Sequence, residues 1–304
     1  METRRLGNSD LDVSVIGLGC MSIGAERQQA KAIIERAIDL GINYLDTADL
    51  YDQGLNEEMI GDVIKDKRQE IILATKVGNR FEKGKEGWTW DPSKQHIIRS
   101  VKESLLRLQT DYIDLYQLHG GTIEDNIDET IDAFEELKKE GLIRQYGISS
   151  IRPNVIREYV ERSSIVTVMM QYSLLDRRPE ELFPLLQEKH VSVVARGPLA
   201  KGLLTERPLS EASSIREKGY LDYTYEELYH VQEAVKQVGS VRSLQANALL
   251  YDLSHPVVAS VVTGASKLSQ VEANVQAVEE PALSNDELLA LKSLTKASTY
   301  QQHR

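Results

Sequence analysis

Short β-rich runs alternate with longer helical patterns along almost the whole of this 304-residue chain. We expect eight strands, near residues 13–19, 42–48, 71–77, 113–119, 143–149, 165–172, 191–197 and 257–264. Between them lie amphipathic stretches such as residues 29–41, whose apolar side chains recur on one helical face. We expect Asn56, Ser93 and Asn126 to cap the starts of three of these helices. This alternation is typical of βαβ units with a parallel sheet, and not of an all-β or all-α protein.

The bulk properties fit one barrel-sized domain. A chain of 304 residues is long for one ordinary compact core but within the range of an α/β barrel. The composition, 41% hydrophobic and 27% charged, argues against disorder. We find no internal linker, low-complexity tract or short repeat, and therefore predict a single domain over residues 1–304. The opening residues resemble a β-hairpin around residues 7–10, which could close the bottom of a barrel.

Several function classes are disfavoured by the sequence. No stretch approaches the roughly 20 apolar residues of a membrane helix, and the N-terminus lacks the apolar core of a signal peptide, so we expect a cytoplasmic protein. The single cysteine, Cys20, excludes an internal disulfide and cannot by itself form a metal site, so no metal is predicted. A net charge of -11 argues against non-specific binding to nucleic acid or anionic membranes. The oligomeric state stays open.

Polar residues stand at or just past the C-terminal ends of three successive predicted strands. They are Asp46, Tyr51, Lys76 and His119. In a closed parallel barrel the strand ends converge on one face, so these side chains can meet in one site. A free tyrosine has a pKa of about 10 and donates a proton poorly unless a cation within about 4 to 6 Å favours the phenolate. We expect Lys76 to be that cation, held by Asp46, and to lower the pKa of Tyr51.

Each of these residues alone also has a plain structural interpretation. Tyr51 could be a half-buried tyrosine on the barrel rim, and His119 a hydrogen-bonded histidine at a strand end. Lys76 could form an ion pair with no chemical role. The presence of all four residues at converging strand ends favours the functional interpretation.

The words around these residues are LDTADLYDQGLNEEMIG, IILATKVG and TDYIDLYQLHGG, and further words are IGLGCM, GLIRQYGISS, MMQYSLLDRR, GPLAKGLL and VVTGASKLSQVEANV. In this order, over nearly the whole chain, they strongly resemble the aldo-keto reductase family. The resemblance implies a (β/α)8 TIM barrel, here with an N-terminal hairpin and extra loops at the C-terminal face. It also implies NADPH-dependent reduction of a small-molecule carbonyl substrate. Tyr51 would then be the proton donor, and His119 would orient the carbonyl or help to relay the proton.

No dinucleotide-binding fingerprint is present. The glycines at 17, 19 and 24 have the wrong spacing and no acidic residue follows at the required distance, although a tight turn there would bring backbone close to a nicotinamide. A better phosphate site is the segment 264–267, because a loop before a helix presents backbone N–H groups to anions. Ser266 and Lys267 could then bind the 2′-phosphate of NADPH. The alternative is a solvated helix start.

The resemblance implies further cofactor contacts. Ser149 and Gln171 match positions that hold the nicotinamide carboxamide, although Ser150 replaces the usual Asn after Ser149. Arg196 stands where an aromatic residue often stacks on the ring, and a guanidinium plane can also stack; the alternative is an outward salt bridge. Gln270, where Arg is common, and Asn274 would lie at the adenine. The full predicted cofactor set is Gly19, Cys20, Met21, Ser149, Gln171, Arg196, Gly197, Pro198, Leu199, Lys201, Gly202, Gly264, Ser266, Lys267, Gln270 and Asn274.

Two segments interrupt the alternation, residues 77–93 and 195–220, and both follow strand C-termini, so both should overhang the site. We predict a wide, partly apolar substrate pocket for aliphatic or aromatic aldehydes. Its residues are Met21, Trp88, Trp90 and Gly120. Equally, the two tryptophans could simply pin a loop to the barrel.

Two other functions stay open at this point. One is a weakly catalytic NADPH-binding sensor or regulatory subunit that acts on a protein partner. The other is a barrel lyase or isomerase in which Lys76 forms a Schiff base. The physiological substrate, the strictness of NADPH over NADH and closure of the loop after Pro198 are also open.

Overall fold

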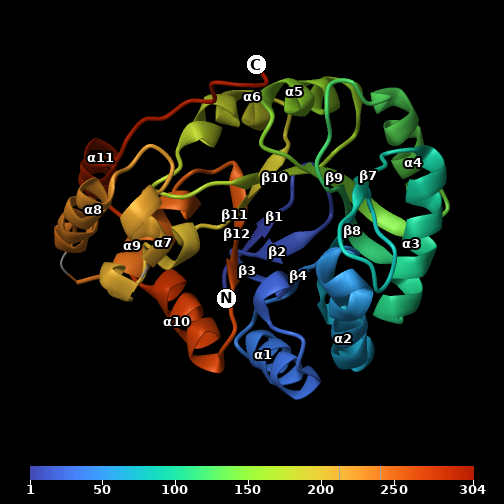
Figure 1. Cartoon of the computed structure of the whole chain (residues 1–304), viewed down its shortest axis with the longest axis horizontal. Helices are drawn as coiled ribbons and strands as arrows, with labels where there is room; N and C mark the ends of the chain where they lie inside the picture. The colour runs from blue at the N-terminus through green and yellow to red at the C-terminus, as the bar shows by residue number, and fades with distance from the viewer. Residues whose placement is uncertain (212, 240) are drawn as a thin grey trace.

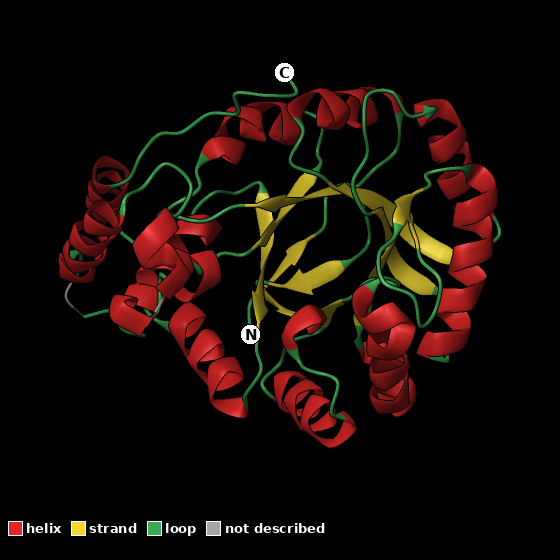
Figure 2. Cartoon of the chain, in the orientation of Figure 1, coloured by secondary structure: helices red, strands yellow, loops and turns green. Residues whose placement is uncertain are grey.

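Eight parallel strands form a closed barrel in the computed structural model, which describes residues 1–211, 213–239 and 241–304. The strand order around the barrel is β10-β11-β12-β3-β4-β5-β8-β9. The strands are β3 (Ile16–Gly19), β4 (Tyr44–Asp46), β5 (Ile72–Val77), β8 (Ile113–Leu118), β9 (Ile143–Ser149), β10 (Thr167–Gln171), β11 (Ser192–Arg196) and β12 (Val258–Gly264). Each lies within one of the eight predicted runs, and the predicted (β/α)8 barrel is confirmed (Figure 2).

Helices surround the barrel and bury its outer face (Figure 1). The α-helices are α1 (Arg27–Asp39), α2 (Leu55–Ile64), α3 (Lys94–Leu108), α4 (Ile127–Lys139), α5 (Pro153–Arg162), α6 (Phe183–Glu188), α7 (Ser213–Lys218), α8 (Tyr225–Gln237), α9 (Leu244–Leu253), α10 (Leu268–Glu279) and α11 (Asn285–Leu294). The 3-10 helices are η1 (Cys20–Ser22), η2 (Tyr51–Gly54), η3 (Lys65–Glu70), η4 (Arg178–Leu182), η5 (Ala200–Gly202) and η6 (Leu209–Glu211). Among the described residues, no helix combines the length and apolarity that a membrane crossing requires.

Helix starts follow the sequence signals in two of three cases. Ser93 caps α3 and Asn126 caps α4, each accepting a hydrogen bond from a backbone N–H of the first turn, as predicted. The predicted cap at Asn56 is wrong, because α2 already begins after Gly54. The Asn56 side chain is buried instead, where it accepts a hydrogen bond from the Thr47 hydroxyl.

A hairpin closes the barrel at the N-terminal ends of its strands. Strands β1 (Thr3–Arg5) and β2 (Asp12–Ser14) pair antiparallel, which confirms the predicted hairpin. Leu6, Leu11 and Val13 of this hairpin pack against side chains of the barrel interior. At Gly7 a Cβ atom would lie 2.1 Å from the carbonyl oxygen of Val166, so only glycine permits this close approach.

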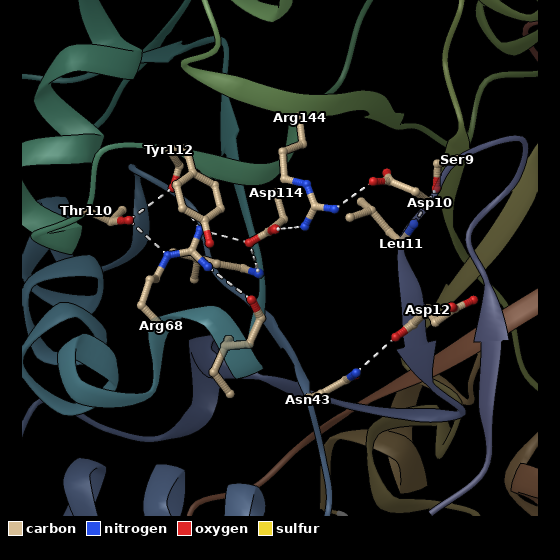
Figure 3. Close-up of polar contacts among 12 residues, drawn as sticks. Ser9, Asp10, Leu11, Asp12, Asn43, Arg68, Thr110, Tyr112, Asp114 and Arg144 are labelled. Carbon is tan, nitrogen blue, oxygen red and sulfur yellow. Dashed lines mark hydrogen bonds and ion pairs between the residues drawn. The ribbon is translucent and has the colours of Figure 1, made fainter.

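A buried carboxylate ties the hairpin to this end of the barrel (Figure 3). Asp114 of β8 is 1% exposed and pairs with Arg144 of β9 at 2.7 Å and with Arg68 of η3 at 2.8 Å. Arg144 also reaches Asp10 in the hairpin, at 2.8 Å. This network stabilises the closed end of the barrel, opposite the polar strand ends.

Three segments lie at the other end, and two of them, after β5 and after β11, were predicted to overhang it. After β5 the chain forms a small hairpin of β6 (Asn79–Arg80) and β7 (Thr89–Trp90). After β11 it forms the short helices η5, η6 and α7 before α8, where the sequence suggested only a loop. After α11 the C-terminal segment runs past α6 and α5 (Figure 1).

Candidate active site

The strand ends bring Asp46, Tyr51, Lys76 and His119 together, and we refer to these four residues as the polar tetrad. Asp46 ends β4, Lys76 lies near the end of β5, and His119 directly follows β8. The Nζ atom of Lys76 lies 2.6 Å from Oδ1 of Asp46 and donates a second hydrogen bond, of 2.7 Å, to the carbonyl oxygen of Thr47. The rings of Tyr51 and His119 meet edge to face, with centroids 5.9 Å apart.

A strained turn positions Tyr51 over Lys76. The three residues after Tyr51 are left-handed, with φ of 48° at Asp52, 53° at Gln53 and 91° at Gly54. Each non-glycine residue in this conformation costs roughly 1–2 kcal/mol. The Gln53 amide offsets part of this cost by bonding the tip of the β6–β7 hairpin, with distances of 2.7 Å to the Lys85 carbonyl and to the Gly84 N–H. The Tyr51 ring centroid then lies 5.3 Å from the Lys76 ammonium.

Lys76 stays charged in this arrangement. Burial acts to lower its pKa, but the Asp46 carboxylate and Tyr51 outweigh burial, so the pKa of Lys76 lies above its usual value. A protonated amine has no lone pair for attack on a carbonyl. The arrangement therefore disfavours the Schiff-base alternative and favours an electrostatic role.

The pKa of Tyr51 differs from the expectation. Burial raises it above its usual value, although the Lys76 charge acts to lower it. Asp46 also acts to raise the pKa of Tyr51, because a carboxylate opposes a second negative charge. The prediction that Lys76 lowers the pKa is therefore correct for the direction of its own effect, but burial outweighs this effect. Tyr51 is a neutral phenol at physiological pH.

His119 is also neutral. Burial lowers its pKa to about 3, and the nearby charges of Lys76 and Arg196 act in the same direction. Its Nδ1 atom is buried without a hydrogen-bond partner among the described residues. An uncharged imidazole here can donate or accept a hydrogen bond, but it cannot serve as a cationic acid near neutral pH.

The polar tetrad lines a cavity of about 1950 Å³ at the C-terminal ends of the strands. All but two of the predicted cofactor and substrate residues also line it. The exceptions are Cys20, whose side chain is fully buried, and Lys267, whose side chain is exposed outside the lining. Because pockets for single small molecules measure about 300–1000 Å³, this cavity has room for a dinucleotide and a substrate together.

Comparison with known proteins identifies the family of this chain. The sequence model of the Aldo/keto reductase family matches residues 15–296. The chain belongs to this family. It is 61% identical over 305 residues to the uncharacterized oxidoreductase YqkF of Bacillus subtilis, with 100% of both chains covered. It is 32% identical to L-galactose dehydrogenase of Arabidopsis thaliana, covering 92% of this chain and 89% of the relative.

A solved structure of the family is also similar to this one in fold and sequence. The holo form of aldo-keto reductase AKR11C1 from Bacillus halodurans superposes with a TM-score of 0.95 at 61% identity. The match covers 100% of this chain and 99% of the other. The resemblance predicted from the motifs is therefore confirmed, and this aldo-keto reductase is an oxidoreductase whose family and fold support carbonyl reduction.

The segment predicted to bind phosphate lies before α10, and Gly264, Ser266 and Gln270 line the cavity there. Lys267 is the residue preceding this helix, and its side chain forms no capping hydrogen bond with the described first turn of α10. The backbone N–H and the hydroxyl of Ser266 both bond Oε1 of Gln270, at 2.7 Å and 3.2 Å. Both donors of Ser266 are thus bonded to Gln270, which must release them before an anion can bind there.

Ser149, Gln171 and Arg196, which were predicted to contact the nicotinamide, end three consecutive strands and line the cavity. Arg196 donates a hydrogen bond of 3.3 Å to Gln171. Within the described part of the chain it forms no salt bridge, so the outward ion pair considered from the sequence is not found. The guanidinium lines the cavity beside Gln171.

Trp90 fills the space beside His119. Its indole N–H bonds the Asp125 carboxylate at 3.0 Å, and its ring lies 3.3 Å from where a Cβ of Gly120 would be. Trp90 therefore pins the β6–β7 hairpin and also lines the cavity. Trp88 and Met21 lie at the mouth, 55% and 67% exposed. The Trp90 ring thus fills part of the space that Gly120 was expected to leave open beside His119.

Two groups of cavity or tetrad residues escaped the sequence analysis. Gln117 donates a hydrogen bond of 3.4 Å to Oδ2 of Asp46, and its position two residues before His119, on the same strand face, was the available signal. The C-terminal residues 297–303 also line the cavity. They are anchored by hydrogen bonds from the Lys296 N–H to the Tyr223 hydroxyl, 2.6 Å, and from the Asn154 N–H to the His303 carbonyl, 2.8 Å. No local sequence pattern predicts that these C-terminal residues line the cavity.

Proposed function

We propose that this protein reduces aldehydes or ketones to alcohols with NADPH, and that Tyr51 is the general acid. The observation that supports this most is the Lys76–Asp46 pair beneath the Tyr51 ring, inside a cavity large enough for cofactor and substrate. An ion pair with only a structural role would not require a cavity of this size beside it. A cofactor site without chemistry needs no protonated lysine beside a buried phenol.

The residues around the cavity fit NADPH. Ser149 and Gln171 offer the donors and acceptors that a carboxamide needs, and Arg196 offers a plane for stacking. Ser266 and Lys267 would bind the 2′-phosphate, with Gln270 and Asn274 at the adenine. When bound, NADPH would supply a hydride to the carbonyl carbon.

The proton comes from the protein. As negative charge develops on the carbonyl oxygen, the Tyr51 hydroxyl donates its proton to that oxygen. The resulting phenolate is stabilised by the Lys76 ammonium, which Asp46 holds in place. His119 donates a neutral hydrogen bond that orients the carbonyl oxygen; with a pKa of about 3 it is not the acid.

The raised pKa of Tyr51 favours reduction over alcohol oxidation at neutral pH. Reduction needs the phenol, which is present at all pH values below the raised pKa. Oxidation needs the phenolate as base, and burial disfavours that form. We therefore expect oxidation to increase with pH well above neutrality.

Some properties are inferred from the sequence alone. We infer a single domain over residues 1–304, a cytoplasmic protein, no metal and no nucleic-acid or membrane partner. These inferences concern context and do not affect the site.

A kinetic screen tests the proposed function. Aldehydes, ketones and sugars are offered with NADPH and with NADH, and carbonyl-dependent loss of reduced-cofactor absorbance is measured. Robust turnover with NADPH is expected. Tight NADPH binding without turnover across the whole panel would contradict the proposal and would support the sensor alternative.

A further inference from the structure

The amide of Gln171 is engaged at both ends. Its Nε2 donates a hydrogen bond of 3.1 Å to Oδ2 of Asp176, and its Oε1 accepts one of 3.3 Å from Arg196. A carboxylate can only accept and a guanidinium can only donate, so these partners determine which way the amide points. Gln171 is thus oriented before any ligand binds.

Asp176 is itself held rigidly. Its side chain is completely buried, and both its oxygens bond Arg178, with distances of 2.7 Å to Nε and 2.7 Å to Nη2. Its backbone pairs with Ser173, through a hydrogen bond of 2.8 Å from the Asp176 N–H to the Ser173 carbonyl. Bidentate ion pairs of this kind fix geometry as well as charge.

The C-terminal segment completes the chain of contacts. The ring of Tyr300 is 4% exposed, and its centroid lies 5.1 Å from the Arg178 guanidinium carbon. Contacts therefore form an unbroken series from Tyr300 through Arg178, Asp176 and Gln171 to Arg196. We call these five residues the amide relay. The outer end is the cavity wall that residues 297–303 build.

The inner end of the amide relay lies beside the polar tetrad. Gln171 ends β10 and pairs in register with Arg196, which ends β11. The charge of Arg196 is close enough to help lower the pKa of His119. The amide relay therefore contacts the end of the cavity where the nicotinamide ring would bind, and not the end near α10 where the adenine would bind.

We propose that Asp176 and Arg178 are positioning residues that hold Gln171 and Arg196 in the orientation needed by the nicotinamide end of the cofactor, and that Tyr300 couples the C-terminal wall to them. This rests on the proposed function, because it requires NADPH in this cavity. Asp176 and Arg178 act through Gln171 rather than by touching the cofactor.

Asp176→Asn is the sharpest perturbation. The asparagine matches the aspartate in size but has one oxygen and one amide NH₂ group. Oδ1 accepts from Arg178 and Oδ2 accepts from both Arg178 and Gln171, so whichever oxygen the NH₂ group replaces, at least one of these donors faces a donor. The change also removes the ionic attraction that holds Arg178 on Asp176, so the partner that fixes Gln171 is no longer fixed itself. Loss of one pre-ordered side chain corresponds to about a 2- to 10-fold loss of affinity. Glu180→Gln is the matched control, since Glu180 pairs with Arg177 at 3.0 Å in the same segment.

Binding of two ligands distinguishes a loss of the amide relay from general damage to the cofactor site. NADP⁺ carries the nicotinamide ring, and 2′,5′-ADP carries only the adenine and phosphate part. Titration calorimetry should show weaker NADP⁺ binding by Asp176→Asn with 2′,5′-ADP affinity preserved, and no change in either for Glu180→Gln. Equal weakening of both ligands, or no weakening of NADP⁺, would overturn the proposal.

A second variant keeps the proposal testable if Asp176→Asn folds poorly. Tyr300→Leu removes the ring above Arg178 without burying a charge, and should weaken NADP⁺ selectively. Tyr300→Phe keeps the ring and should bind like the wild type. Identical binding by the leucine and phenylalanine variants would overturn the coupling to the C-terminal wall. Failure of the wild type to bind NADP⁺ at all would instead overturn the proposed function, and this proposal with it.

Discussion

Replacing Lys76 by methionine should remove the cation that stabilises the Tyr51 phenolate. The ammonium lies 5.3 Å from the ring centroid. At that separation two unit charges interact by about 3 kcal/mol when the effective dielectric constant is about 20, which corresponds to roughly 10²-fold in rate. The single change also leaves Asp46 buried without its cation, which costs about 3–5 kcal/mol of stability.

The rate effect and the folding effect can be separated by a double variant. Lys76→Met with Asp46→Asn removes both charges, and Asp46→Asn alone is the control. For each protein, kcat/KM for one aldehyde with NADPH is measured at pH 7 beside a denaturant unfolding curve. The double variant should unfold near the wild type and lose about 10²-fold in kcat/KM. A well-folded double variant within about threefold of the wild-type rate would refute the electrostatic role of Lys76.

Three further predictions follow from the described side chains. Between about pH 5 and pH 9, kcat/KM for reduction should stay flat, because neither His119 nor Tyr51 titrates there; a fall through pH 6 to 7 would make His119 the acid. Lys267→Ala should raise the Kd for NADPH far more than for NADH, and equal losses would remove Lys267 from the 2′-phosphate. Asp114→Asn should lower the free energy of unfolding by about 3 kcal/mol with unchanged kcat, and unchanged denaturant stability would contradict its role at the barrel bottom.

The strands could be predicted because each is an apolar, β-branched run bounded by polar residues. The hairpin at residues 1–14 could be predicted from its turn residues around Gly7 rather than from its strands, which are short and largely polar. Asn56 was misleading because its amide is used in the interior, by Thr47 and the Cys20 carbonyl, rather than at a helix end. A capping residue and a buried polar residue look alike until the packing is known.

The polar tetrad was predictable because polar residues at the ends of apolar strands must converge in a closed barrel. The net pKa of Tyr51 was not, because burial is a property of the whole cavity and outweighs the charge of Lys76. The cavity wall at residues 297–303 depends on docking against Tyr223 and Asn154, far away in sequence. Contacts of that kind leave no periodic pattern.

The central claim is that the Tyr51 hydroxyl gives up the proton, and Tyr51→Phe tests it most directly. Phenylalanine keeps the ring above Lys76 and removes only the oxygen. Single-turnover reduction of one aldehyde and NADPH binding are measured on the same preparation. We expect the rate to fall by about 10²- to 10⁴-fold with NADPH affinity nearly unchanged. A variant that binds NADPH normally and keeps most of the wild-type rate would contradict the claim.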